Sequence, residues 1–368
     1  MSLLFAKIAG YFGETFSKFG TRDRRLDLLK GLAVMAVIAL HVRVGRMEVQ
    51  RAFGYTFWIG MAVPVFMLVS AYLFTLSYIR KGWNSAADAL AFENLMPAMT
   101  RFLMPFLLLF PLEVWMTLRE RGQDGWWYLI ERFPLGGFGS GSYYVTLLVE
   151  FLLFFPLLSF AVRRSPYRAL ICAFVVNVLV EVMSYGLHMS NLSYGYVIFR
   201  YWFLLAIGAF FAVRCEDGLS RSEWIALIIA GILGGVYKWL SAYDGFSLPF
   251  FKLWTIVNLP SCLWILPFMA LWLFHVRYDG RWSVILRPIE LIGVASYDVY
   301  LVQKIYHGYF YSPVAGMTYY GLLKRELPLL CIIGFAYFLI ESTLTRRAGA
   351  AVAKLAAGSR LSPEQKAR

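Results

Sequence analysis

Apolar residues gather in long runs along almost the whole chain, and short polar segments separate one run from the next. An α-helix needs about 20 residues to cross the hydrocarbon core of a bilayer. The pattern therefore predicts an all-α protein, a polytopic integral-membrane bundle of about ten transmembrane helices. The runs lie near residues 28–46, 57–78, 101–118, 143–162, 168–186, 195–213, 223–240, 255–276, 287–307 and 327–344.

Two of these runs contain residues that are unusual inside a membrane helix. The third run includes Pro105 and Pro111, and the ninth includes Glu290, Asp298 and Lys304. Proline removes a backbone hydrogen bond from a helix, and ionisable side chains are costly to bury in lipid. The ends of these two helices are therefore poorly marked by the sequence.

Composition and charge place the chain in the same class. Hydrophobic residues make up 60% of the sequence, charged residues only 15%, and the mean hydropathy is +0.62, which is typical of multi-pass membrane proteins. Most of the 35 Lys and Arg residues fall on the side of the predicted helices that holds both ends of the chain. Basic loops stay in the cytoplasm, so both termini are predicted to be cytoplasmic.

The formal net charge of +13 bears on the expected partners. It favours contact with anionic head groups of membrane lipid. Outside the membrane segments the sequence has no basic stripe with interleaved aromatic residues, so no nucleic acid partner is expected.

The chain divides into three parts around the membrane runs. Apolar residues recur at helical spacing within residues 1–22, which predicts an amphipathic segment lying on the cytoplasmic leaflet; an unstructured leader is the alternative. Residues 23–345 form the predicted membrane domain, and residues 346–368 form a basic cytoplasmic tail.

Cysteine and histidine are too few and too scattered to indicate a metal centre. Cys172, Cys215, Cys262 and Cys331 form no metal-ligand spacing, and the chain has four histidines outside any His/Cys/carboxylate cluster. Neither a metal site nor a bound cofactor is therefore expected.

A glycine-rich segment, residues 119–142, lies between the third and fourth runs and is predicted to face the outside. Its glycines allow the backbone to approach other groups closely, and Trp126, Trp127 and Tyr128 stand among them. Aromatic rings are a common platform for sugars, while tryptophans also anchor a protein at the membrane surface. The sequence supports both interpretations equally.

Lys30 and His41 are the most informative polar residues, eleven positions apart in the first run. Each helical residue turns by about 100° and rises by about 1.5 Å, so the two side chains share one face and lie roughly 16 Å apart. Asp27 precedes Lys30 by three residues, the spacing of a helical ion pair. Ionisable groups along a membrane helix are rare and functional, so the stripe predicts a polar path through the bilayer.

Five segments along the chain have distinctive patterns, namely residues 26–41, 63–73, 143–156, 293–301 and 337–341. In this order they resemble signatures of the acyltransferase-3 family of integral-membrane acyltransferases. The first has Leu-Asp, a basic residue and then His41, and the fourth reads Gly-x-x-Ser-Tyr-x-x-Tyr-Leu. Two positions depart from the pattern: Gln303 stands where the family often has His, and Arg101 alone precedes Pro105, where a pair of arginines is usual.

The resemblance implies a membrane-bound O-acyltransferase of the bacterial inner membrane. Such a protein passes an acyl group, with acetyl as the leading candidate, from acyl-CoA as co-substrate to a hydroxyl of a cell-envelope or exported carbohydrate. The expected partners are then a carbohydrate or lipid-linked glycan acceptor, acyl-CoA, membrane lipid and proteins of polysaccharide biosynthesis.

Within this hypothesis the residue types suggest roles. The candidate catalytic residues are His41, Lys30 and Asp27. An imidazole titrates near neutral pH, so His41 can act as general base for the hydroxyl or carry the acyl group. Lys30, oriented by Asp27, is expected to meet the phosphates of acyl-CoA. Further candidates for binding donor or acceptor are Arg101, Glu150, Arg200, Tyr297, Tyr300 and Gln303.

Structural interpretations and other functions stay open beside this one. Lys30 could extend to lipid head groups, and His41 could be an interfacial side chain, as His188, His275 and His307 are interpreted to be. A transporter or flippase of a lipid-linked sugar is one alternative function, and a non-catalytic subunit of a polysaccharide assembly complex is another. Neither alternative needs the imidazole of His41.

Overall fold

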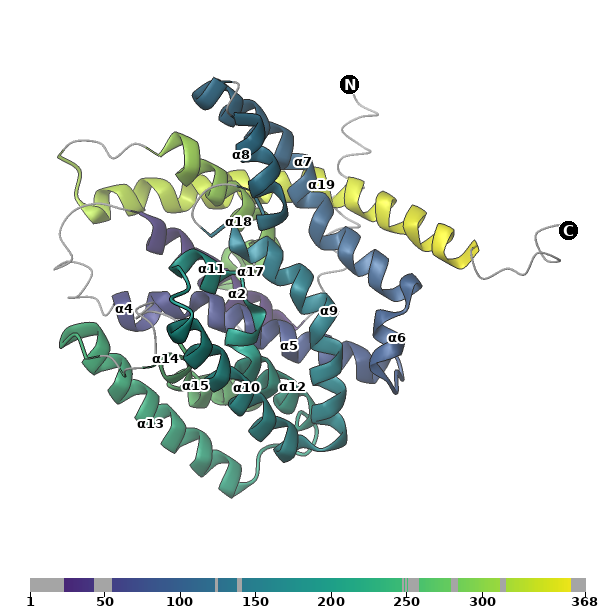
Figure 1. Cartoon of the computed structure of the whole chain (residues 1–368), viewed down its shortest axis with the longest axis vertical. Helices are drawn as coiled ribbons and strands as arrows, with labels where there is room; N and C mark the ends of the chain where they lie inside the picture. The colour runs from purple at the N-terminus through teal and green to yellow at the C-terminus, as the bar shows by residue number, and fades with distance from the viewer. Residues whose placement is uncertain are drawn as a thin grey trace, which may run out of the picture.

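The described part of the chain is entirely helical in its regular elements (Figure 1), as the sequence predicted. The predicted amphipathic segment 1–22 lies outside the described residues, so that prediction stays open. The computed structural model describes residues 23–42, 55–122, 125–137, 141–246, 248, 250, 258–278, 284–311 and 316–358.

Six of the described helices are long and apolar enough to cross a membrane. Each corresponds to one of the predicted runs, and together they define a multi-pass membrane protein. They are α5 (Ala62–Arg80), α7 (Phe92–Arg121), α9 (Tyr143–Arg164), α10 (Pro166–Gly186), α13 (Arg221–Tyr243) and α19 (Tyr319–Gly358).

Two further runs fold into shorter apolar helices. The count of ten membrane helices and the cytoplasmic position of the termini therefore stay predictions. The sixth run forms η5 (Ile198–Tyr201) and α12 (Trp202–Val213), and the eighth forms α14 (Leu259–Leu263) and α15 (Leu266–Phe274).

The first and ninth runs are the most polar. The first forms a single helix, α2 (Arg24–His41), and its first turn is capped by the side chain of Asp23. The ninth run is broken in two and ends in a π-helical turn. Its parts are α17 (Arg287–Val294), α18 (Ser296–Ile305) and η6 (Tyr306–Phe310).

The third run forms a longer helix than the sequence suggested. α7 starts nine residues before the predicted position 101 and continues through its three prolines. The segment before it contains α6 (Ala86–Leu90), which begins with a capping box formed by Ser85 and Asp88. Short helices form in other connections too, namely α4 (Tyr55–Trp58), η2 (Ile59–Met61), α8 (Gly125–Arg132), η4 (Phe133–Leu135) and α11 (Asn191–Gly195). At the other end of the chain, α19 runs through position 345 without a break.

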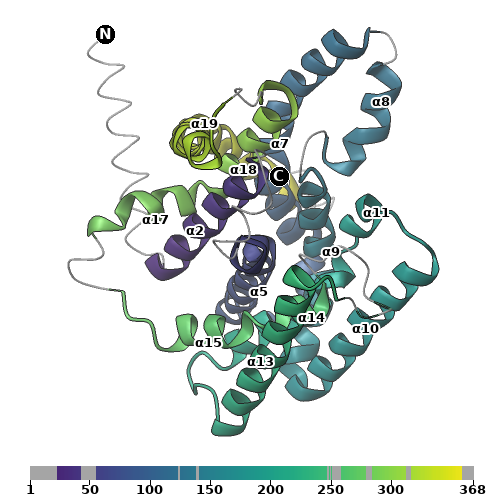
Figure 2. The same cartoon turned by 90° about the vertical axis from the view of Figure 1, so that its left-hand side faces the viewer.

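α2 packs against α17, α5, α18 and α19, and Figure 2 shows it among them. Its contact with α17 is a contact between backbones. A Cβ atom at Gly293 would overlap the carbonyl group of Asp27, and a Cβ atom at Gly31 would overlap that of Ile289. Glycine lets membrane helices approach this closely. The contact therefore fixes the helix that carries the predicted polar stripe.

The outward faces of α10 and α13 are apolar. In water an exposed patch of this size would promote association, whereas lipid tails solvate it. These faces therefore fit a position against lipid. Their exposed side chains include Ile171, Phe174, Val175, Leu179, Ile225, Ile228, Ile229, Ile232, Leu233 and Val236.

The helix contact at Gly293 can be tested by adding one methyl group. Gly293→Ala is expected to destabilise the protein by about 1–3 kcal/mol, the usual effect of overpacking, because the added carbon would overlap the Asp27 carbonyl. The measurement is the thermal midpoint of the detergent-solubilised protein. Gly186→Ala is the control, since nothing lies within 4 Å of the added carbon there. Equal midpoints for the two variants would contradict the close contact.

Candidate functional site

A cavity of about 640 Å³ opens beside the N-terminal end of α2. One part of its wall is apolar, formed by α5, the end of α12 and Leu26, and the other part carries three cationic and three acidic side chains. A cavity whose wall is apolar on one part and charged on another can hold a ligand that has an apolar part and an anionic part. Its charged residues are Asp23, Arg25, Asp27, Lys30, Arg80 and Glu216.

The ion pair predicted between Asp27 and Lys30 is present. Lys30 Nζ lies 2.7 Å from Asp27 Oδ1, and both side chains line the cavity. The Lys30 side chain is 15% exposed and that of Asp27 is 7% exposed, so the ammonium group can meet a ligand while the carboxylate orients it. Arg25 lines the same wall, where it is paired with Asp23 at 2.8 Å.

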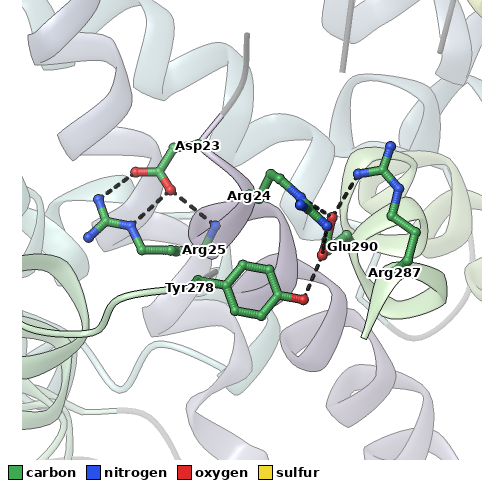
Figure 3. A network of polar contacts seen from close by, with 6 residues as sticks. All are labelled: Asp23, Arg24, Arg25, Tyr278, Arg287 and Glu290. Carbon is green, nitrogen blue, oxygen red and sulfur yellow. Dashed lines mark hydrogen bonds and ion pairs between the residues drawn. The ribbon is translucent and has the colours of Figure 1, made fainter. Parts of the chain in front are cut away.

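A second polar network holds the start of α2 from the other side (Figure 3). The Glu290 carboxylate accepts hydrogen bonds from Arg24 Nε and Nη2, each 2.9 Å long, from Arg287 at 2.9 Å and from the Tyr278 hydroxyl at 2.6 Å. Burial and the bond to Glu290 raise the pKa of Tyr278 to about 12, so its hydroxyl keeps the proton that it donates. The network joins α2, α17 and the segment after α15.

His41 ends α2, and its ring lies beside that of His307, a contact that the sequence did not predict. Its ring centroid lies 5.9 Å from that of His307. From the sequence, His307 was interpreted as an interfacial side chain, and this interpretation did not predict its contact with His41. The sequence offers no spacing that relates His307 to His41, because the two residues lie far apart in the chain.

A buried ion pair, Lys304 with Glu113, joins α18 to α7. Lys304 Nζ lies 2.5 Å from Glu113 Oε1, and the two side chains are 0% and 1% exposed. Lys304 also donates a 2.9 Å hydrogen bond to the Gly136 carbonyl and lies 5.0 Å from the Phe106 ring centroid. The sequence showed Lys304 within a membrane run but did not identify its partner.

Glycines bring the loop after η4 against this ion pair. Gly136 and Gly137 have φ of +81° and +83°, a conformation that favours glycine. A Cβ atom at Gly137 would overlap the Glu113 carboxylate. The prediction of close backbone approach is therefore confirmed for this part of the glycine-rich segment. Trp126 and Trp127 are 57% and 78% exposed on α8, which leaves both interpretations of the aromatic residues open.

The candidates on α18 take different positions. Tyr297 donates a 2.9 Å hydrogen bond to the Phe102 carbonyl, and Tyr300 donates one to the carbonyl of Gly141. These two hydroxyls therefore join α18 to neighbouring segments. Gln303 is fully buried, and its amide has no hydrogen-bond partner within the described residues.

Arg101 is exposed on α7, and its positive charge interacts electrostatically with the carboxyl group of Glu341 on α19. Glu341 in turn shares a hydrogen bond with Asp298, so this group joins α7, α18 and α19. It lies apart from the charged residues that line the cavity at α2.

Glu150 and Arg200 occupy a third region, around η5. Glu150 accepts a 2.8 Å hydrogen bond from the Ile198 backbone N–H, so its carboxylate caps the start of η5. Arg200 is 3% exposed and lies over three tyrosine rings. Its guanidinium carbon is 5.5, 5.0 and 4.4 Å from the ring centroids of Tyr143, Tyr194 and Tyr201.

The predicted site residues thus form separate groups in the described structure. Asp27 and Lys30 lie together at the cavity, while His41 lies at the opposite end of α2, beside His307. α2 positions both of these groups, and η6 completes the second with His307.

Comparison with known families agrees with the resemblance seen in the sequence. Residues 23–346 match the acyltransferase domain family Acyl_transf_3, so the chain belongs to this family. With its apolar helices, it is a multi-pass membrane acyltransferase. No characterised protein and no solved structure matches the chain.

The buried ion pair gives a prediction about stability. Lys304→Met is expected to cost about 3–5 kcal/mol, because it leaves the Glu113 charge buried without its cation. The double variant with Glu113→Gln is expected to recover most of the loss, as measured by thermal unfolding in detergent. Arg25→Met is the control. It breaks the more exposed pair with Asp23 and the hydrogen bonds to the Leu273 and Val276 carbonyls, and it is expected to lose less than Lys304→Met. Equal losses from the two single variants would contradict the burial of Lys304.

Proposed function

We propose that the protein transfers an acyl group, with acetyl as the leading candidate, from acyl-CoA to a carbohydrate hydroxyl at or beyond the outer face of the bacterial inner membrane. The observation that supports this most directly is the arrangement of α2. One end of the helix carries the Asp27–Lys30 pair in the cavity, and the other end carries His41. Donor and acceptor would therefore meet along one helix, from opposite sides of the bilayer.

The donor would bind in the cavity at the N-terminal end of α2. The phosphates of acyl-CoA are anionic, and Arg25, Lys30 and Arg80 line this cavity. Arginine and lysine are the usual phosphate-binding side chains. The apolar wall formed by α5 and α12 suits the uncharged arm that carries the thioester. Acyl-CoA is made in the cytoplasm, which agrees with the predicted orientation of this end of the helix.

His41 would perform the chemistry. Transfer to a hydroxyl needs a group that accepts the hydroxyl proton during attack, and an imidazole does this near neutral pH. The same imidazole can instead attack the thioester and carry the acyl group before passing it on. Both routes use His41 at the end of α2 that lies far from the cavity.

The acceptor would be an exported or envelope glycan, such as a lipid-linked oligosaccharide, an exopolysaccharide unit, a lipopolysaccharide or a periplasmic glucan. The exposed tryptophans of α8 could bind its sugar rings or anchor α8 in the membrane surface. Proteins of polysaccharide biosynthesis would supply this acceptor. A flippase or a non-catalytic subunit is the outcome to be expected if no acyl transfer is found.

The first test compares wild type with His41→Ala in nanodiscs. With radiolabelled acetyl-CoA, wild type is expected to release CoA and label a cell-envelope glycan fraction. The variant is expected to lose glycan labelling by a factor of about 10² or more, the usual contribution of a positioned base or nucleophile. His188→Ala is the control. If wild type releases no CoA from acetyl-CoA or succinyl-CoA, the enzymatic function is wrong.

Cys215 allows a direct test of donor binding. Its thiol is exposed and lines the cavity, and partial burial together with Glu216 raises its pKa above the usual value of 9.0. Because the thiolate is the reactive form, alkylation by iodoacetamide is expected to accelerate as the pH rises above 9. Saturating CoA is expected to slow alkylation several-fold in a Cys172→Ser background, and Lys30→Met is expected to remove this protection. Equal rates with and without CoA would contradict donor binding here.

A further inference from the structure

His41 can act as general base or as carrier of the acyl group, and the two routes differ in whether a second base must stand beside it. The structure places His307 there. His307 stands on the π-helical turn η6, and its ring plane is inclined by 45° to that of His41. At a centroid distance of 5.9 Å, one small hydroxyl group could contact both imidazoles. Both side chains are partly exposed, although the two ring nitrogens of His307 are themselves buried.

The position of His307 depends on a local irregularity of the helix. α18 ends at Ile305, and the next five residues form the π-helical turn. Such turns change the direction of the side chains that follow, and they are frequent at functional sites. Because α18 packs against α2, the turn presents its histidine to the C-terminal end of α2, where His41 lies.

The surroundings of His307 are aromatic rings and paired charges. The ring centroids of Tyr306 and Tyr311 lie 5.4 and 5.0 Å from its own. Tyr306 shares a hydrogen bond with Glu326, which is paired with Arg325 at 2.5 Å. In the buried ion pair between α18 and α7, the Glu113 carboxylate is likewise paired with a cation, Lys304. Glu326 and Glu113, near this end of α18, thus each have a cationic partner.

We propose that His307 is a second catalytic histidine, which takes the proton of the acceptor hydroxyl when that hydroxyl attacks an acyl group carried by His41. The proposal rests on the proposed function and chooses the acyl-histidine route within it. It also assigns separate tasks to the two imidazoles, since the one that carries the acyl group is the leaving group of the second step and cannot be its base.

The reaction then has two half-steps that balance. In the first, a ring nitrogen of His41 attacks the thioester carbon, the N–C bond forms, the C–S bond breaks, and the imidazole proton goes to the departing thiolate of CoA. In the second, the acceptor oxygen attacks the acyl carbon, the O–C bond forms and the N–C bond breaks. His307 accepts the hydroxyl proton and passes it to the ring of His41, which restores both neutral imidazoles.

The test separates the half-steps by rapid mixing of protein in nanodiscs with radiolabelled acetyl-CoA and a glycan acceptor. His307→Gln keeps the size of the side chain but removes the base. It is expected to release about one equivalent of CoA in a burst, to accumulate label on the protein, and to lose transfer to glycan by about 10²–10⁴-fold. CoA is measured by chromatography, and hydroxylamine captures the acyl group as a hydroxamate. His307→Ala is expected to behave in the same way.

Two control variants show whether the effect is specific to His307. His275→Gln alters a histidine whose ring contacts Trp224 instead, and it is expected to retain wild-type transfer. His41→Ala is expected to give neither burst nor label. If His307→Gln transfers within tenfold of wild type, or loses CoA release together with transfer, the role of His307 is wrong. Failure of wild type to release CoA would instead remove the proposed function, so the two failures are distinguishable.

Discussion

The geometry of the candidate site depends on a contact between two helix backbones. α2 and α17 meet where Gly31 and Gly293 leave no side chain between them. The hydrogen bonds from Arg24 to Glu290 hold the start of the same interface. Because α2 is a continuous helix, fixing it against α17 also fixes how far the cavity lies from His41. A larger residue at either glycine would therefore disturb both ends of the site together.

Charged side chains inside the bundle are stabilised in three different ways. Lys304 and Glu113 neutralise each other in an ion pair that is almost completely buried. Arg200 lies against tyrosine rings, whose faces attract a cation. Glu150 accepts a hydrogen bond from the first backbone N–H of η5, where the positive end of a helix favours an anion. Each solution meets the requirement that a charge in a low-dielectric environment has a partner.

The sequence predicted the features that depend on local spacing and missed those that depend on packing. The apolar runs located the membrane helices because a bilayer sets their length, and three-residue spacing predicted the pair of Asp27 with Lys30. The contact of His41 with His307 joins residues far apart in the chain, and no spacing rule relates them. Likewise, glycines announced close backbone approach, but the group approached, Glu113, became visible only in the fold.

The separation of the cationic cavity from His41 has an electrical consequence. Under the proposed function and the predicted orientation, the phosphates of CoA remain beside Arg25, Lys30 and Arg80, and only the acyl group moves outward. Moving one elementary charge across the whole membrane involves about 2.3 kcal/mol per 100 mV. An acetyl group is uncharged, so the membrane voltage neither drives nor opposes its passage. A succinyl group carries a carboxylate, and an inside-negative voltage would draw it outward. The identity of the acyl group thus decides whether the transfer is coupled to the energy state of the cell.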